Sequence, residues 1–230
     1  ITGTGSSVFI LTGAKNIRFD GIARTGTRQM IIRGAGTANN AFLLQEHTNN
    51  VTITNCSISV TANFTATTAG LITIGGSTGA GTGNSKIAIT NNNIGGTSTI
   101  TVSYAVFSDN ALGGTANNDN TITGNSINDF RAVSPGCGVH VTANGNGGKW
   151  TISSNGFFMS ANCTVTAVPI YFLAGSASND NVFSSNFIGG NTATATGTWT
   201  NTGNTNVLGI YVNAGTVTIS GNTIQNIVNT

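Results

Sequence analysis

The sequence predicts an all-β solenoid, in which short parallel strands of successive repeats stack on one another. Three observations indicate this fold. A strand-like motif recurs six times at intervals of 30 to 36 residues, and a second strand-like motif recurs out of phase with it. Thr, Asn and Gly, which are poor helix formers, fill 102 of the 230 positions. We therefore expect one all-β domain over residues 1–230.

The first motif starts as an alternating strand and then turns a corner. An apolar residue is followed two positions later by an Ile or Phe, and both are predicted to point inward. A further Ile or Phe follows five positions later, and it can point inward only if the chain bends between the two. The copies are VTITNCSI (Val51–Ile58), IAITNNNI (Ile87–Ile94), NTITGNSI (Asn120–Ile127), WTISSNGF (Trp150–Phe157), NVFSSNFI (Asn181–Ile188) and VTISGNTI (Val217–Ile224).

The second motif predicts another strand in every repeat. Its copies read AFLLQE from Ala41, GLITIG from Gly70, AVFSDN from Ala105, GVHVTA from Gly138, PIYFLA from Pro169 and GIYVNA from Gly209. The predicted inward residues are Phe42, Leu71, Ala105, Val139, Ile170 and Ile210, followed two positions later by Leu44, Thr73, Phe107, Val141, Phe172 and Val212. Thr73 is the one polar exception. Together the two motifs supply a continuous apolar interior.

A polar column accompanies the bend of the first motif. The third residue after the inward Ile or Phe is, in order, Cys56, Asn92, Asn125, Asn155, Asn186 and Asn222. This pattern resembles the right-handed parallel β-helix of the pectin-lyase-like type, with about seven turns. The resemblance implies that the Asn residues form a ladder, whose amides pair the backbone groups of a buried corner. Because Cys56 interrupts the ladder, we expect a different corner there.

The composition of several segments resembles that of a narrower group of proteins. Segments such as NFIGGNTATATGTWTNTGNTNV resemble repeats of very large secreted or surface-attached bacterial proteins. The resemblance implies an extracellular or cell-surface location and a structural or adhesive role. Since neither end of the sequence shows a solenoid cap, we expect a piece of a longer protein, or copies that stack end to end into a fibre.

The scarcity of charge argues against several classes of function. Only 6% of the residues are charged and the net charge is +2, so the basic face that a nucleic acid requires is not expected. No apolar run approaches the roughly 18 residues of a membrane span. Three cysteines, Cys56, Cys137 and Cys163, are expected to be buried free thiols. The sequence indicates no cofactor and no metal site.

A candidate binding surface lies on the outward positions of the second strand. These positions are predicted to hold Leu43, Ile72, Val106, His140, Tyr171 and Tyr211, where a solvated sheet should show polar residues. The aromatic members His140, Tyr171 and Tyr211 could stack against sugar rings or contact a partner. The alternative is that loops such as 192–206 or 111–118 cover the stripe.

Catalysis is the alternative from another class, because many β-helices of the family that the sequence resembles cleave acidic glycans. Hydrolysis requires a pair of carboxylates roughly 5 to 10 Å apart, and a lyase needs a Ca²⁺ site and a base. Glu46 and Asp109 are the only acidic pair that the repeat aligns, two turns and about 10 Å apart. The sequence therefore favours a non-enzymatic protein over a polysaccharide lyase or glycoside hydrolase.

The outward positions of the first strand suggest a third function. They are rich in Thr and Ser and almost free of charge, so they predict a flat face two residues wide. Regular Thr ranks on a flat β-solenoid are how several unrelated ice-binding proteins order water. The simpler interpretation is that Thr is a good outward residue of a half-exposed sheet. The positions are Thr52, Thr54, Ala88, Thr90, Thr121, Thr123, Thr151, Ser153, Val182, Ser184, Thr218 and Ser220.

Overall fold

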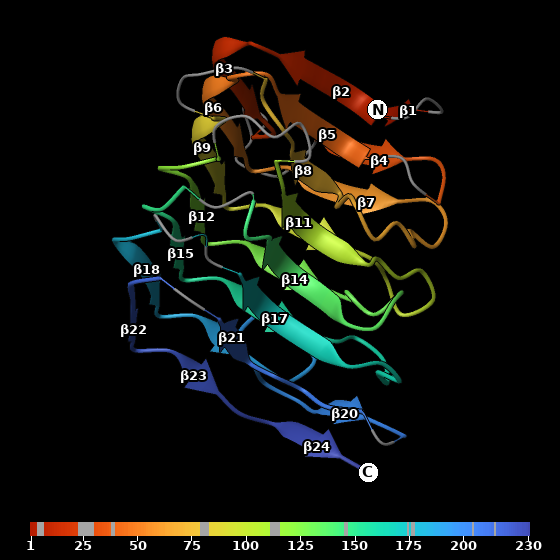
Figure 1. The fold of residues 1–230 in the computed structure, drawn as a ribbon. Coiled ribbons are helices and arrows are strands. Elements are labelled where there is room, and N and C mark those ends of the chain that lie inside the picture. The colour runs from red at the N-terminus through yellow and green to blue at the C-terminus, as the bar shows by residue number, and fades with distance from the viewer. Residues whose placement is uncertain are drawn as a thin grey trace.

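The protein is a parallel β-solenoid, as the sequence predicts. The computed structural model describes the whole chain except residues 4–6, 23–29, 38–39, 79–82, 111–115, 145–146, 174, 176–177, 204 and 214. The described residues contain strands and no helix, and the strands build three parallel sheets (Figure 1). The two termini lie at opposite ends of the stack.

Each coil of the chain contributes one strand to each sheet, in the order A, B, C. Sheet A contains β1 (Thr2–Gly3), β4 (Ile31–Gly34), β7 (Ser57–Val60), β10 (Asn93–Gly95), β13 (Ser126–Asn128), β16 (Gly156–Phe158), β19 (Phe187–Ile188) and β23 (Thr223–Ile224). Sheet B contains β2 (Ser7–Thr12), β5 (Asn40–Gln45), β8 (Ile72–Ile74), β11 (Tyr104–Ser108), β14 (Gly136–Val141), β17 (Ala167–Phe172) and β21 (Ile210–Val212).

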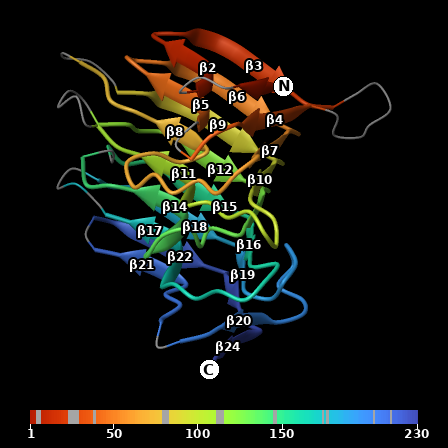
Figure 2. The ribbon, with the colours of Figure 1, turned by 90° about the vertical axis from the view of Figure 1, so that its right-hand side faces the viewer.

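Sheet C is built from the alternating part of the first motif. It contains β3 (Lys15–Asp20), β6 (Asn49–Thr54), β9 (Ser85–Thr90), β12 (Thr121–Thr123), β15 (Thr151–Ser153), β18 (Asn181–Ser184) and β22 (Val217–Ser220). Two further strands, β20 (Trp199–Asn201) and β24 (Ile227–Asn229), pair beside the last coils. Figure 2 shows the three sheets as columns in which coil lies upon coil. The seven strands of sheet C are separated by six turns, close to the predicted number.

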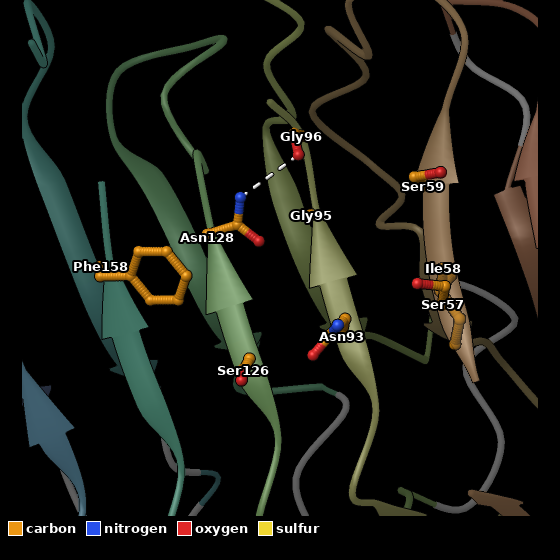
Figure 3. Close-up of a pocket in the computed structure, with 9 residues that line it drawn as sticks. All are labelled: Ser57, Ile58, Ser59, Asn93, Gly95, Gly96, Ser126, Asn128 and Phe158. Carbon is orange, nitrogen blue, oxygen red and sulfur yellow. Dashed lines mark hydrogen bonds between the residues drawn. The ribbon is translucent and has the colours of Figure 1, made fainter. Parts of the chain in front are cut away.

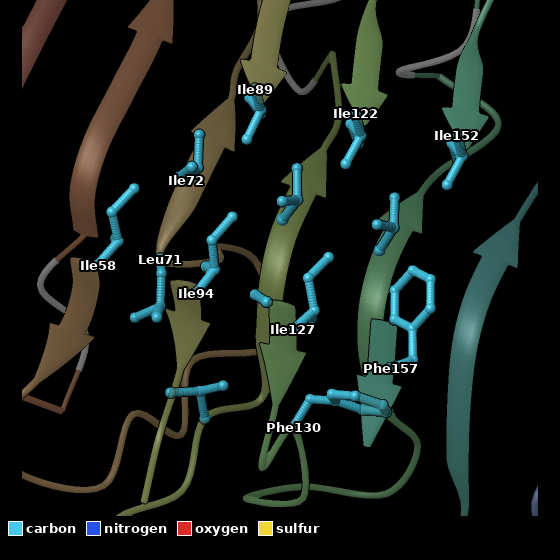
Figure 4. Packing of buried hydrophobic residues seen from close by; sticks show 14 of the residues in the cluster. Ile58, Leu71, Ile72, Ile89, Ile94, Ile122, Ile127, Phe130, Ile152 and Phe157 are labelled. Atoms are coloured by element: carbon cyan, nitrogen blue, oxygen red, sulfur yellow. The ribbon is translucent and has the colours of Figure 1, made fainter. Parts of the chain in front are cut away.

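The core consists of apolar columns that run along the axis of the solenoid. Ile89, Ile122 and Ile152 occupy one register position of sheet C, and all three are completely buried (Figure 4). Ile58, Ile94, Ile127 and Phe157 form the corresponding column of sheet A. Because each column continues through several coils, the interior of one coil is closed by the next.

The Asn ladder satisfies the backbone at the corner between sheets C and A. The Asn155 side chain accepts a hydrogen bond from the Asn125 backbone N–H at 3.0 Å and donates one to the Ile122 carbonyl at 2.9 Å. Its oxygen also accepts from the Asn125 amide at 2.9 Å. The same pattern links the buried or half-buried members Asn92, Asn125, Asn155, Asn186 and Asn222.

The corner at Cys56 has the backbone conformation of the others, and what differs is the side chain, since Cys56 Sγ donates to the Thr54 carbonyl of its own coil at 3.2 Å. The Cys56 backbone N–H donates to Asn92 Oδ1 at 2.9 Å, as the ladder requires of every coil. The residue before the ladder position, rather than the ladder Asn, adopts the left-handed conformation. Its φ is 57° at Asn55, 55° at Asn91 and 70° at Gly124. Asn and Gly tolerate this region, which explains the small polar residues of the motif.

A second set of buried amides lies at the turn between sheets B and C. Asn117 Oδ1 accepts from the backbone N–H of Asn84 at 2.9 Å, and Asn84 Oδ1 accepts from that of Thr48 at 3.0 Å. Both Asn side chains are fully buried. The repeat pattern did not reveal this ladder, because the position three residues before each copy of the first motif holds Asn only at Asn84 and Asn117, and other copies have Thr48, Gly147 or Ser178 there.

We expect Asn155→Ala to lower the free energy of unfolding by about 2 to 5 kcal/mol. The substitution leaves a buried N–H and a buried carbonyl without partners, and each such group costs about 1 to 3 kcal/mol. Urea unfolding followed by circular dichroism would measure the change. Asn179→Ala, at an exposed Asn of a neighbouring turn, is the matched control and should stay close to the parent protein. Equal effects of the two substitutions would contradict the role assigned to the ladder.

Candidate functional site

The candidate site is the outer face of sheet B, but two of its predicted residues are wrong. The register pairs Leu43 with Thr73, Thr73 with Phe107 and Phe107 with His140. Ile72 and Val106 face the core and are fully buried. Both segments carry adjacent apolar residues that fit either phase of alternation, and a one-residue shift moves each side chain to the other face. The shift also explains why a polar residue occurs at Thr73, which was predicted to point inward. Thr73 lies on the outer face, in register with Leu43.

The predicted site residues His140, Tyr171 and Tyr211 do lie on the outer face and touch one another. We call Phe107, His140, Tyr171 and Tyr211, on four successive coils, the aromatic column. The rings of His140 and Tyr171 stack with centroids 4.7 Å apart, and those of Tyr171 and Tyr211 meet edge to face at 5.0 Å. The Phe107 ring meets that of His140 at 5.4 Å. The four residues therefore form one continuous strip of rings across the coils.

Exposure increases along the aromatic column toward the C-terminal end. Phe107 is buried, His140 and Tyr171 are half-buried, and Tyr211 is 39% exposed. Tyr104 lies beside the column, with its ring 4.9 Å from that of His140, and is buried as well. Trp199, in the segment 192–206 expected as a cover, is buried against Phe130 instead. Most of the other proposed cover, residues 111–118, lies outside the described residues.

His140 is enclosed by rings and has no hydrogen-bonding partner among the described residues. Neither Nδ1 nor Nε2 makes a hydrogen bond, and both atoms are buried. Burial lowers the pKa of His140 to about 4, and the nearby Asp109 carboxylate opposes the shift. The imidazole is therefore neutral at pH 7. Burial likewise raises the pKa of Tyr104 to about 12, with contributions from Cys137 and Tyr171.

A hollow of about 210 Å³ adjoins the buried end of the aromatic column. Its floor combines apolar, hydroxyl and amide groups with one carboxylate, that of Asp109. The glycines contribute no side chain, and a Cβ on Gly75 would come within 3.3 Å of Leu43. Sheet B thus offers rings and hydrogen-bonding groups side by side. The described lining residues are Leu43, Gln45, Thr68, Thr73, Gly75, Gly76, Phe107 and Asp109.

Glu46 and Asp109 do not occupy one register column, so their predicted alignment was wrong. Leu44 pairs with Ile74, and Ile74 pairs with Ser108, so Asp109 continues the column of Gln45 rather than that of Glu46. The Glu46 carboxylate accepts hydrogen bonds from the backbone N–H and hydroxyl of Thr78, and it does not line the hollow. The offset again follows from the one-residue shift in the second motif.

A second, larger groove of about 370 Å³ lies on the outer face of sheet A (Figure 3). Its floor is made of small residues such as Ser57 and Ser126, with Asn93 between them in the same register column. Asn128 donates to the Gly96 carbonyl at 3.2 Å, and Phe158 contributes a single ring at one end. The groove on sheet A has neither an aromatic column nor a carboxylate among its described lining residues, so we assign the candidate site to sheet B.

The cysteines behave as the sequence predicts. Cys56, Cys137 and Cys163 are free and buried, and burial raises the pKa of the Cys137 and Cys163 thiols. Nowhere in the described part of the chain do three or more His, Cys, Asp or Glu side chains gather as metal ligands would. The described residues include no helix that is long and apolar enough to cross a membrane.

Comparison with known proteins leaves the fold as the main guide. No protein-family model, curated protein or solved structure matches the chain. The arguments below therefore rest on the geometry of the sheet B face.

We expect the stability of the protein to rise between pH 4.5 and 6.5 because of His140. Its pKa is about 4 in the folded state against 6.5 when free, so the unfolded state binds more protons in this window. A hydrogen bond from Asn55 lowers the pKa of Asp20, and hydrogen bonds from Thr78 lower that of Glu46. These two carboxylates change the free energy of unfolding mainly below pH 4.5.

Urea unfolding at pH 5 and pH 7 would measure this effect in the parent protein and in His140→Phe. The phenyl ring keeps the packing against Tyr104 and Tyr171 but does not titrate. The parent protein should lose stability at pH 5, and the variant should lose less. An equal loss in both proteins would contradict the assignment to His140.

Proposed function

We propose that the chain is a non-enzymatic, extracellular β-helix of a bacterial surface or fibre protein, with a structural or adhesive role. Its outer sheet B face contacts glycans. The observation that carries this proposal is the aromatic column, since sugar rings pack well against aromatic faces and exposed apolar strips mark binding surfaces. The column offers about one ring per coil, at the roughly 4.8 Å spacing of stacked strands. We also propose that the chain is related to the pectin-lyase-like β-helices.

Apolar side chains that continue the core columns of sheets A and C are exposed in the last coil. Ile219 continues the buried column of Phe183 and Ile152, yet it is 52% exposed in the last coil. Ile224, which continues the column of Ile188, is 55% exposed. Covering these side chains would bury apolar area and pair the open strand edges.

Glycan cleavage is the runner-up function, and the hollow is where it would take place. Asp109 is the one carboxylate among the described lining residues, whereas the usual hydrolytic mechanism requires a pair. His140, which interacts electrostatically with Asp109, has its nitrogens buried between rings. These features favour binding over catalysis.

We expect Tyr171→Ala and Tyr211→Ala each to weaken glycan binding about fivefold to tenfold. Each loses a stacking surface that contributes about 1 kcal/mol. Retardation in native gels containing soluble polysaccharides would measure the affinity. Phe187→Ala is the matched control, because Phe187 is 40% exposed on the outer face of sheet A, against 39% for Tyr211. Unchanged retardation of both tyrosine variants would contradict the proposal.

A second candidate function, ice binding, is favoured by the outer face of sheet C. Thr121, Thr151 and their neighbours are half-buried in register, and the hydroxyls of Thr123 and Ser153 lie 3.0 Å apart. Hydroxyls that pair along the axis are held in fixed positions, as an ordered layer of water would require. Thr54, however, is only 3% exposed, and Ala88 and Val182 interrupt the ranks.

If sheet C binds ice, the protein should inhibit ice recrystallisation at micromolar concentration. Thr151→Lys should abolish the inhibition, because a long charged side chain disrupts a flat face. Microscopy of a frozen sucrose solution would measure crystal growth. Crystals that coarsen equally with and without the protein would exclude this candidate.

A further inference from the structure

We propose that the hollow beside the aromatic column binds an uncharged sugar unit and selects against uronates, through the carboxylate of Asp109. This inference rests on the proposed function, because it names the class of glycan that the outer face of sheet B accepts. It is carried by the position of Asp109, by the charges around the hollow and by the continuity of the hollow with the rings.

Asp109 follows β11 directly, and its carboxylate is held in place by a neighbouring coil. The hydroxyl of Thr142 donates to Asp109 Oδ1 at 2.6 Å. Asp109 Oδ2 makes no hydrogen bond to any residue that the structure describes, and Asp109 lines the hollow. A fixed carboxylate with a free oxygen accepts hydrogen bonds from sugar hydroxyls, and such charge-assisted bonds are stronger than neutral ones. The site therefore suits a ligand rich in hydroxyl donors.

The one charged side chain in the described lining of the hollow is the carboxylate of Asp109. The seven strands of sheet B contain no Lys or Arg. Two acidic residues directly follow strands of this sheet. They are Glu46 after β5 and Asp109 after β11. His140 is neutral at pH 7, so it does not offset the Asp109 charge. A uronate carboxylate placed here would meet like charge without a cation in the described lining to pair it.

The described lining also lacks the ligands for a Ca²⁺ ion that could bridge the protein and an acidic glycan. A Ca²⁺ bridge requires six to eight oxygen ligands with several carboxylates, and the hollow supplies one. Gln45 and Thr73 instead offer neutral polar side chains, and Phe107 offers an apolar surface at the junction with the rings. Further units of a chain would then lie over His140 and Tyr171, at the spacing of successive coils.

The test compares the parent protein with Asp109→Asn on a neutral β-linked glucan and on polygalacturonate, by isothermal titration calorimetry at low salt. The parent protein should bind the glucan and bind polygalacturonate at least tenfold more weakly. Asp109→Asn should bind the glucan about fivefold to tenfold more weakly, since a charged acceptor is replaced by a neutral one. Its affinity for polygalacturonate should rise, because the repulsion is removed.

Asp180→Asn is the matched control, because it removes the same charge from an exposed position two coils further along the stack, which does not line the hollow. It should leave both affinities unchanged, and circular dichroism confirms that each variant is folded. Should Asp109→Asn not fold, Thr142→Val, which frees the carboxylate from its anchor, should weaken glucan binding instead.

Tighter binding of polygalacturonate than of glucan by the parent protein would overturn the inference, and so would equal glucan affinities of Asp109→Asn and the parent. In both cases the tyrosine variants would still lose binding, so the proposed function would stand. If the parent protein binds neither polysaccharide, the proposed function and this inference both fail.

Discussion

The structure depends on one constraint, which is that every buried backbone group of a coil must find its partner on the next coil. Along the strands, the parallel ladders of the three sheets provide these partners. At the corner between sheets C and A the ladder amides take over, and the Asn155 side chain, for example, bonds Asn125 and Ile122 of the preceding coil and Asn186 of the next. Because the corner is fixed, it determines which side chains point inward in the strand before it and in the strand after it.

Stacking in a fixed register turns distant residues into neighbours. His140, Tyr171 and Tyr211 are 31 and 40 positions apart in the chain, yet their rings are in contact. The same register places opposite charges one above another where the sheet C strands begin. Lys86, Asp119, Lys149 and Asp180 occupy this position on successive coils, in the left-handed conformation. A surface on this fold is therefore a column, and its chemistry is set by one position of the repeat.

The sequence was sufficient to predict part of the candidate site. His140, Tyr171 and Tyr211 each stand between two apolar residues and carry the most polar side chain of the three, and their outward orientation is confirmed. Phe107 and Thr73 were assigned to the wrong face because their copies contain adjacent apolar residues. The hollow and the role of Asp109 could not be predicted, since they depend on glycines and on a Thr hydroxyl brought together from different coils.

The sequence by itself determined the repeat, the two strand motifs of each coil and the Asn column at the bend, because these follow from local patterns that recur at a nearly constant spacing. Only the tertiary structure decided which phase each strand of sheet B adopts, how far each ring is exposed and which carboxylate faces the hollow. The physical reason is that a strand with apolar residues on both faces satisfies alternation in either phase. Its phase is then fixed by the neighbouring coils, through backbone pairing and the space available in the core.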